Sequence, residues 1–257
     1  MLRIHLYCNE LEVCNPLGSS KKKHKLVCFY CFVGNIGTFN ISSLRNIFLV
    51  LVIKSSKLKH YGYKKVLEQL VADVKLLESI GINVYDIELN RNIQVLGTIA
   101  AVSADNLGAH DMGGFRKCFS SGRICRYCMC MYDDIKQKFE ETDFVMRTPS
   151  NYAKHVAAIA NDTSLSSVYD ITSNCPLNQL VGFSAVSCFP PDLMHDCFEG
   201  VVMYFLQYLF QALNDDCCSI NEINNKINSF CFGSTSIKNK PKCKCCSTSR
   251  TCQFVSQ

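Results

Sequence analysis

The chain has 257 residues, enough to bury a substantial hydrophobic core. Hydrophobic residues make up 48% and charged residues 19%, which excludes an intrinsically disordered chain of low hydrophobicity and high charge. The net charge of +5 suits an anionic partner, but the basic residues are scattered except in residues 21–25 and 238–244, and such short runs are more often solvated loops than nucleic-acid footprints.

The first part of the chain predicts three strands. Two apolar segments, Leu2–Cys8 and Leu26–Val33, are typical of strands, and the Asn15–Gly18 turn with the following lysine run joins them as a long-looped hairpin. The β-branched and aromatic run Asn46–Ile53 predicts a third strand that is buried on both faces.

The most regular periodicity lies between Tyr63 and Ile80, where apolar residues recur every three or four positions. Gly81 follows at the place of a helix C-cap, so we predict a helix over this range. A hairpin around residues 90–92 comes next, and the run Leu96–Ala104 predicts a fourth core strand.

A polar, cysteine-containing stretch then interrupts the pattern over residues 113–174, and we interpret it as an insertion. Pro190 and Pro191 lead into a long amphipathic helix over Leu193–Leu213, whose apolar face we expect to pack on a core. The predicted organisation is 1–112 as the first part of the core, 113–174 as the insertion, 175–232 as the late helical part and 233–257 as a disordered tail.

The 18 cysteines fall singly on apolar segments, for example at Cys8, Cys28 and Cys188, as reduced and buried thiols do. No basic leader followed by an apolar core is apparent, and the longest apolar run, 47–53, is too short to span a membrane. We therefore expect an intracellular protein, located in the nucleus, without a membrane partner.

Carboxylates stand near the ends of predicted elements. Asp105 follows a strand, and Asp192, His195 and Glu199 share one face of the late helix if that helix is an α-helix. Two-metal phosphoryl chemistry needs carboxylates gathered at one place. Simpler roles are open as well: Asp192 suits an N-cap, Asp105 suits a turn cap, and Glu199 suits a solvated helix position.

The order of three antiparallel strands, a helix, a fourth strand and a later helix is that of the RNase H-like fold. Five stretches resemble the transposase domain of animal DNA transposons related to the CACTA or En/Spm group, over about residues 5–240. They are YCNELEVCNPLG (7–18), HKLVCFYCFVGNI (24–36), SADNLGAHDMGGF (103–115), RICRYC (123–128) and PPDLMHDCFEGVV (190–202). The resemblance implies an α+β fold, with an RNase H-like mixed sheet, flanking helices and the insertion before the late helix.

Such enzymes are DDE recombinases, in which two aspartates at strand ends and a glutamate on a later helix hold Mg²⁺ or Mn²⁺ for attack on DNA phosphodiester bonds. The resemblance assigns Asp105 as the second carboxylate and Glu199 as the third. Asp196 and His195 are second choices on the same helix. Asn9 stands where the first aspartate is expected, so the sequence departs from the pattern there.

An amide offers a metal ion one carbonyl oxygen but no negative charge, and hard divalent cations depend on that charge. Glu10 and Glu12 are close to Asn9 in sequence, but Glu10 points to the opposite face of the strand. We therefore expect a partial transposase core with impaired catalysis and residual binding to DNA at transposon ends. An active metal-dependent nuclease would require Glu10 or Glu12 to replace the missing aspartate.

Cys125 and Cys128 form a CxxC pair, whose two thiolates can share one tetrahedral zinc ion. The resemblance favours His155 as a further ligand. Other candidates for the second half of the site are Cys118, Cys130 and His110, and two unligated cysteines are the simpler interpretation. The alternative function is an intracellular, zinc-stabilised module that binds DNA or protein without catalysis.

Overall fold

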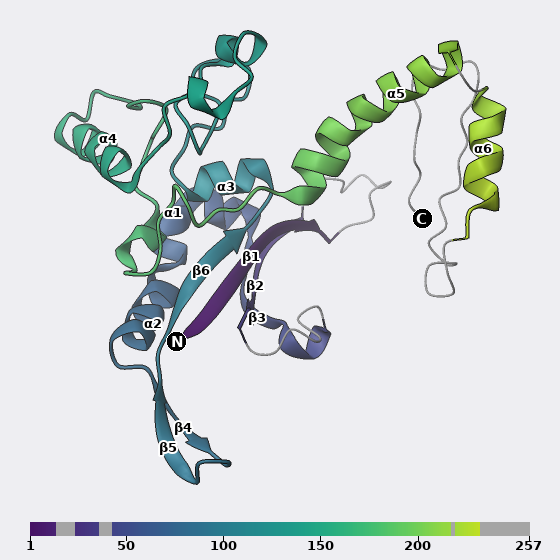
Figure 1. Cartoon of the computed structure of the whole chain (residues 1–257). Helices are drawn as coiled ribbons and strands as arrows, with labels where there is room; N and C mark the ends of the chain where they lie inside the picture. Colours follow the sequence, from purple (N-terminus) through teal and green to yellow (C-terminus); the bar gives the residue numbers. More distant parts are fainter. Residues whose placement is uncertain (14–23, 36–42, 217–218, 232–257) are drawn as a thin grey trace. The chain divides into compact units, whose positions relative to one another are not determined.

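The computed structural model describes residues 1–13, 24–35, 43–216 and 219–231 (Figure 1). The chain divides into two compact units, Met1–Asp192 and Leu193–Gln257, which are described separately. The predicted Asn15–Gly18 turn, residues 21–23 of the lysine run and the predicted tail over residues 233–257 lie outside the described residues.

A four-stranded mixed sheet is the centre of the first unit (Figure 1). It contains β1 (Leu2–Glu12), β2 (Lys25–Val33), β3 (Phe48–Lys54) and β6 (Gly97–Ser103) in the order β3-β2-β1-β6. The β1–β2 and β2–β3 pairs are antiparallel, and β6 runs parallel to β1. The predicted α+β class, with a mixed sheet and flanking helices, is confirmed.

Helices cover one face of this sheet. The first, α1 (Ser55–Val66), contacts β2 and β3, and the second, α2 (Glu68–Ser79), contacts β6. A separate hairpin of β4 (Ile82–Asp86) and β5 (Arg91–Val95) extends beyond the end of the sheet in Figure 1 and leads into β6.

The core forms between these helices and the sheet because side chains alternate along each strand. Leu6 and Cys8 on β1 are buried, whereas Tyr7 between them is largely exposed. The fully buried Phe29 of β2 lies on the same face of the sheet as Cys8, its directly paired residue. The residues that cover this face from the helices are Leu58, Leu67, Val71 and Val74.

The prediction that the third strand is buried on both faces is wrong. β3 is an edge strand of the described sheet, and Phe48 is 55% exposed and Leu49 58% exposed. A run of β-branched and aromatic residues indicates strand propensity, but it does not show whether the strand will be central or peripheral.

The helix predicted between Tyr63 and Ile80 is confirmed in part. Its C-terminus is as expected, since Gly81 has φ +76° and donates its N–H to the Leu76 carbonyl at 2.9 Å. Upstream, the helical region begins at Ser55 and is interrupted at Gly62, which has φ +73°, and again at Leu67. Apolar residues recur every three or four positions on both sides of the break at Leu67, so the sequence pattern did not predict that break.

The insertion is folded and shares the main core. Its largest element, α4 (Pro149–Asn161), was not predicted, although Thr148-Pro149 carries a helix-start signal. The Thr148 hydroxyl accepts the Asn151 N–H at 3.1 Å, and the Asn151 side chain returns a bond to the Thr148 N–H. The shorter helix α3 (Asn106–Met112) directly follows β6, and the described part of the first unit also has short 3₁₀ helices at Leu44–Asn46, Tyr132–Lys136, Glu141–Asp143 and Pro176–Gln179.

Tyr152 fixes α4 to the remainder of the unit. Its buried hydroxyl donates to the Gly113 carbonyl at 2.8 Å and accepts the Cys175 N–H at 2.9 Å.

We expect Tyr152→Phe to lower the free energy of unfolding by about 1–3 kcal/mol, because two buried backbone groups lose their partner. Urea unfolding followed by circular dichroism measures this value. Tyr169→Phe is the control: its exposed ring keeps its stacking contacts, and a loss as large as that of Tyr152→Phe would contradict the assignment.

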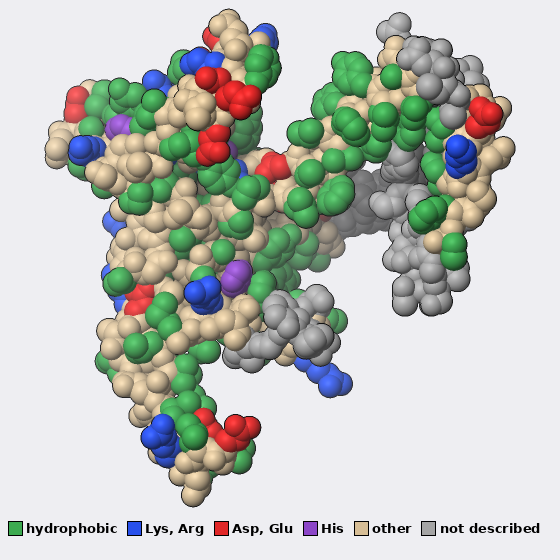
Figure 2. All heavy atoms as spheres, viewed as in Figure 1, with side chains coloured by type: hydrophobic (Ala, Val, Ile, Leu, Met, Phe, Trp, Pro, Cys, Tyr) green, Lys and Arg blue, Asp and Glu red, His purple; other side chains and the backbone are tan. Residues whose placement is uncertain are grey.

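The second unit contains a π-helix, η5 (Leu193–Val201), followed by α5 (Val202–Asp216) and α6 (Ile220–Ser229). The long α-helix predicted over 193–213 is thus replaced at its start by π-helical geometry, with a non-helical backbone at Gly200. Most of the apolar side chains predicted to pack on a core are exposed, among them Phe198, Phe205 and Tyr208, and Figure 2 shows hydrophobic side chains along α5. Among the described residues, no helix is long and apolar enough to cross a membrane.

Candidate functional site

Asn9 and Asp105 lie at the same end of two neighbouring parallel strands. The β1–β6 pairing ends with Tyr7 opposite Ser103, and Asn9 and Asp105 each follow two residues later. Parallel strands end at the same edge of a sheet, so the chain brings these two predicted site residues together. Both line a single cavity of about 630 Å³.

Charged groups of both signs surround this cavity, which we call the site pocket. Besides Asn9, its polar lining contains Ser55, Tyr63, the carboxylates of Glu10, Asp105 and Asp111, and the ammonium groups of Lys25, Lys59 and Lys117. Acidic groups that could attract a cation are therefore adjacent to lysines that could bind phosphate oxygens.

Asp105 caps α3, as its simpler interpretation predicted. One carboxylate oxygen accepts the Gly108 N–H at 2.6 Å. Its negative charge also acts on the pocket wall: burial, followed by the charge of Asp105, raises the pKa of the Cys8 thiol to about 12. Burial is likewise the main cause of the raised pKa of Tyr63, to which Cys8, Asp111 and Asp105 contribute. Asp105 therefore caps helix α3 and at the same time lines the site pocket with its negative charge.

Sequence reasoning missed Asp111, which lies in α3 and lines the same pocket. Its carboxylate forms an ion pair with Lys117 at 2.8 Å. The SADNLGAHD stretch contains both aspartates, but their proximity to one pocket depends on where the short helix α3 turns after β6, which the sequence alone did not indicate.

Glu10 is already engaged. Its carboxylate bonds to the Lys25 ammonium and accepts the Ser55 hydroxyl at 2.5 Å. The hydrogen bond from Lys25, followed by that from Ser55, lowers the pKa of Glu10, so it is an ionised partner of these two groups. Replacement of the missing aspartate at residue 9 by Glu10 would require both bonds to be broken.

Glu199, Asp196 and His195 all belong to η5 in the second unit. The predicted common face of Asp192, His195 and Glu199 assumed 3.6 residues per turn. A π-helix closes its hydrogen bonds from i to i+5 and turns less per residue than an α-helix, so a spacing of three does not align side chains there, and Asp192 precedes η5. The face prediction is therefore wrong, and the choice of Glu199 rests on the sequence resemblance.

Backbone N–H groups bond to one sulfur of the Cys125–Cys128 pair. The N–H groups of Tyr127 and Cys128 both donate to the Cys125 sulfur, at 3.3 and 3.4 Å. The Cys128 thiol hydrogen-bonds with the thiols of Cys125 and Cys130, and burial is the main cause that raises its pKa to about 12. In kind and in spacing, these thiols fit one side of a zinc site.

His155 has a different immediate environment. Its ring stacks on Tyr169 with centroids 4.5 Å apart, and its buried Nδ1 atom has no hydrogen-bond partner. Burial, followed by the charges of Arg147 and Arg123, lowers its pKa. Within the described parts of the chain, no group of three or more His, Cys, Asp or Glu side chains is arranged to hold a metal ion.

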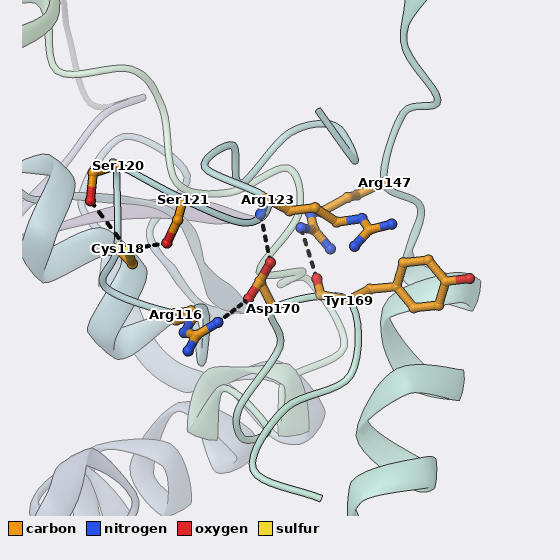
Figure 3. A network of polar contacts seen from close by, with 8 residues as sticks. All are labelled: Arg116, Cys118, Ser120, Ser121, Arg123, Arg147, Tyr169 and Asp170. Atoms are coloured by element: carbon orange, nitrogen blue, oxygen red, sulfur yellow. Dashed lines mark hydrogen bonds and ion pairs between the residues drawn. The ribbon is translucent and has the colours of Figure 1, made fainter. Parts of the chain in front are cut away.

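The other predicted zinc candidates have contacts of their own. His110 donates from Nδ1 to the Asn106 carbonyl at 2.8 Å, and its buried Nε2 atom has no partner. Cys118 lies within hydrogen-bonding distance of Ser121 and Ser120, and these bonds, with Ser121 first, lower the pKa of its thiol to about 7 (Figure 3).

A buried carboxylate anchors the loop that carries the cysteine pair. Asp170 accepts the Arg123 N–H at 2.6 Å and pairs with the Arg116 guanidinium at 3.1 Å (Figure 3). Arg147 donates to the Tyr169 carbonyl and to the Cys125 carbonyl, each at 3.1 Å. The position of the Cys125–Cys128 loop is therefore fixed by hydrogen bonds of Asp170 and Arg147, charged residues that are distant from it in sequence.

The sequence matches no protein-family model, and comparison with curated proteins finds no similar protein.

Proposed function

We propose that this chain is a transposon-derived RNase H-like core of the DDE type that binds DNA and is impaired in catalysis. The observation that carries the proposal is the presence of Asn9 and Asp105 in one pocket at adjacent ends of parallel strands. The strand order β3-β2-β1-β6 supports it, because it follows the antiparallel-then-parallel order expected for such a core.

The residues of the site pocket explain both the impaired catalysis and the DNA binding that we propose. Mg²⁺ or Mn²⁺, when bound, would supply the activation of water for attack on a phosphodiester bond, and Asp105 would be a charged ligand for it in the site pocket. Asn9 contributes a neutral oxygen in place of the first carboxylate, so the attraction for a cation is weakened. Lys59, which forms no ion pair among the described residues, can still bind a DNA phosphate, which retains an affinity for DNA and suits a nuclear location.

An assay with supercoiled plasmid DNA tests this proposal. The unaltered chain should bind the plasmid at low salt and leave it intact in the presence of Mg²⁺ or Mn²⁺. Rapid nicking that EDTA abolishes would contradict the impaired site, whereas absence of DNA binding at low salt would contradict the proposed partner.

A zinc-stabilised interaction module is the second candidate function, favoured by the N–H to sulfur bonds at Cys125. We expect purified protein to contain stoichiometric zinc that depends on Cys125 and Cys128, and Cys125→Ser/Cys128→Ser to lose it. Elemental analysis by mass spectrometry measures the metal. Cys188→Ser, which changes a thiol outside the Cys125–Cys128 pair, should retain zinc, and unaltered protein without zinc would exclude the metal site.

A further inference from the structure

A second cavity lies beside the site pocket. Its volume is about 380 Å³, and it shares Lys25, Ser55 and Lys59 with the site pocket. The remaining lining residues are Val13, His24, Leu26, Lys54 and Ser56. Because the two cavities have three lining residues in common, they adjoin, and a ligand longer than a single phosphate group could occupy both.

Among the described residues, the lining of the second cavity is positive and contains no acidic residue. It is built where the ends of β2 and β3 meet the start of α1, so Lys25, Lys54 and Lys59 come from three different elements. Lys25 is engaged with Glu10, which lies in the site pocket. Lys54 and Lys59 are exposed, and within the described residues neither forms an ion pair.

The chemistry of this lining suits a phosphate diester. Ammonium groups supply charge, the Ser56 hydroxyl can donate a hydrogen bond, and His24 adds a further donor when it is protonated. The adjoining site pocket is lined by the carboxylates of Glu10, Asp105 and Asp111, which would repel a phosphate placed there without a metal ion. The second cavity is therefore the more favourable of the two for an anion.

We propose that the second cavity holds a backbone phosphate of a nucleic-acid strand whose neighbouring part lies over the site pocket. This inference rests on the proposed binding of DNA, and it adds the place at which one backbone phosphate is held. A polynucleotide fits better than a free phosphate ion, because only a chain with successive phosphates can use the continuous wall of Lys25, Ser55 and Lys59.

The salt dependence of DNA binding tests the location. For a duplex oligonucleotide, the slope of log affinity against log salt decreases in magnitude by about 0.9 for each phosphate contact that is lost. Lys54→Gln/Lys59→Gln removes both exposed lysines that face the one proposed phosphate, so it should reduce the slope by about 0.9 relative to the unaltered chain. Fluorescence anisotropy between about 50 and 200 mM NaCl measures the slopes over a suitable range.

Two further variants make the result specific. Lys57→Gln/Lys64→Gln removes two exposed lysines of the same helix that line neither cavity, and it should leave the slope unchanged. Lys54→Arg/Lys59→Arg keeps both charges and should keep the slope. Thermal melts confirm that each variant is folded, as expected for substitutions at exposed positions.

Equal slopes for the two glutamine variants would overturn the subsite and leave the proposed core intact. Absence of DNA binding by the unaltered chain would overturn the subsite together with the proposed DNA partner. Inorganic phosphate serves as the competitor: if millimolar phosphate displaces the oligonucleotide from the unaltered chain but not from Lys54→Gln/Lys59→Gln, the cavity is a site for free phosphate, and the assignment to a strand is wrong.

Discussion

Asn9→Asp should bind Mn²⁺ at least about tenfold more tightly than the unaltered chain, a difference of about 1.4 kcal/mol. The substitution replaces a neutral amide by a carboxylate at the edge where Asp105 already stands, and affinity for hard cations rises with the number of charged oxygen ligands. The side chain keeps its shape, so the change tests charge rather than packing. Isothermal titration calorimetry measures the affinity.

Asn83→Asp is the matched control for this result. Asn83 is exposed on β4, in the hairpin outside the four-stranded sheet, and its substitution adds the same charge away from the site pocket. Mn²⁺ affinity should not change in this variant. If both variants gained affinity equally, the effect would be one of net charge, and residue 9 would have no special place in a metal site.

Phe29→Ala should lower the free energy of unfolding by about 3–5 kcal/mol. Phe29 is fully buried in β2, where it faces α1 and α2, and its truncation leaves a cavity at the centre of the core. Since a domain of this size has about 5–15 kcal/mol of stability in total, the loss is a large part of it. Chemical denaturation monitored by tyrosine fluorescence and circular dichroism gives the value.

Phe48→Ala is the control for Phe29→Ala, because it truncates the same kind of side chain in the same sheet. Phe48 is 55% exposed on the edge strand β3, so its truncation removes little buried surface and should cost less than about 1 kcal/mol. Similar losses for the two variants, or the absence of a cooperative transition in the unaltered chain, would contradict the core described for the first unit.

The sequence was sufficient for the features that depend on local patterns. Strands β1, β2 and β6 were predicted from apolar runs, and the C-cap at Gly81 from a glycine after a periodic segment. The sequence resemblance grouped Asn9 with Asp105, but the parallel pairing of β1 with β6, which brings both residues to one pocket, is known only from the structure.

Features that depend on tertiary context were not predictable in the same way. The exposure of β3 is decided by the absence of a further described strand beside it, which its own residues do not encode. The π-helix at Leu193–Val201 preserves an amphipathic sequence while changing which side chains align. Asp111 entered the site pocket through the position of α3, and Lys54 and Lys59 became neighbours of Lys25 through pairing of β2 with β3.

Metal-dependent nicking by Asn9→Asp is the most direct test of the central claim, that the site pocket is a DDE-type centre lacking its first carboxylate. Supercoiled plasmid should be nicked in Mn²⁺ by Asn9→Asp, left intact by the unaltered chain, and left intact again by Asn9→Asp/Asp105→Asn. Nicking by the unaltered chain at the rate of Asn9→Asp, or nicking that persists without Asp105, would contradict the claim.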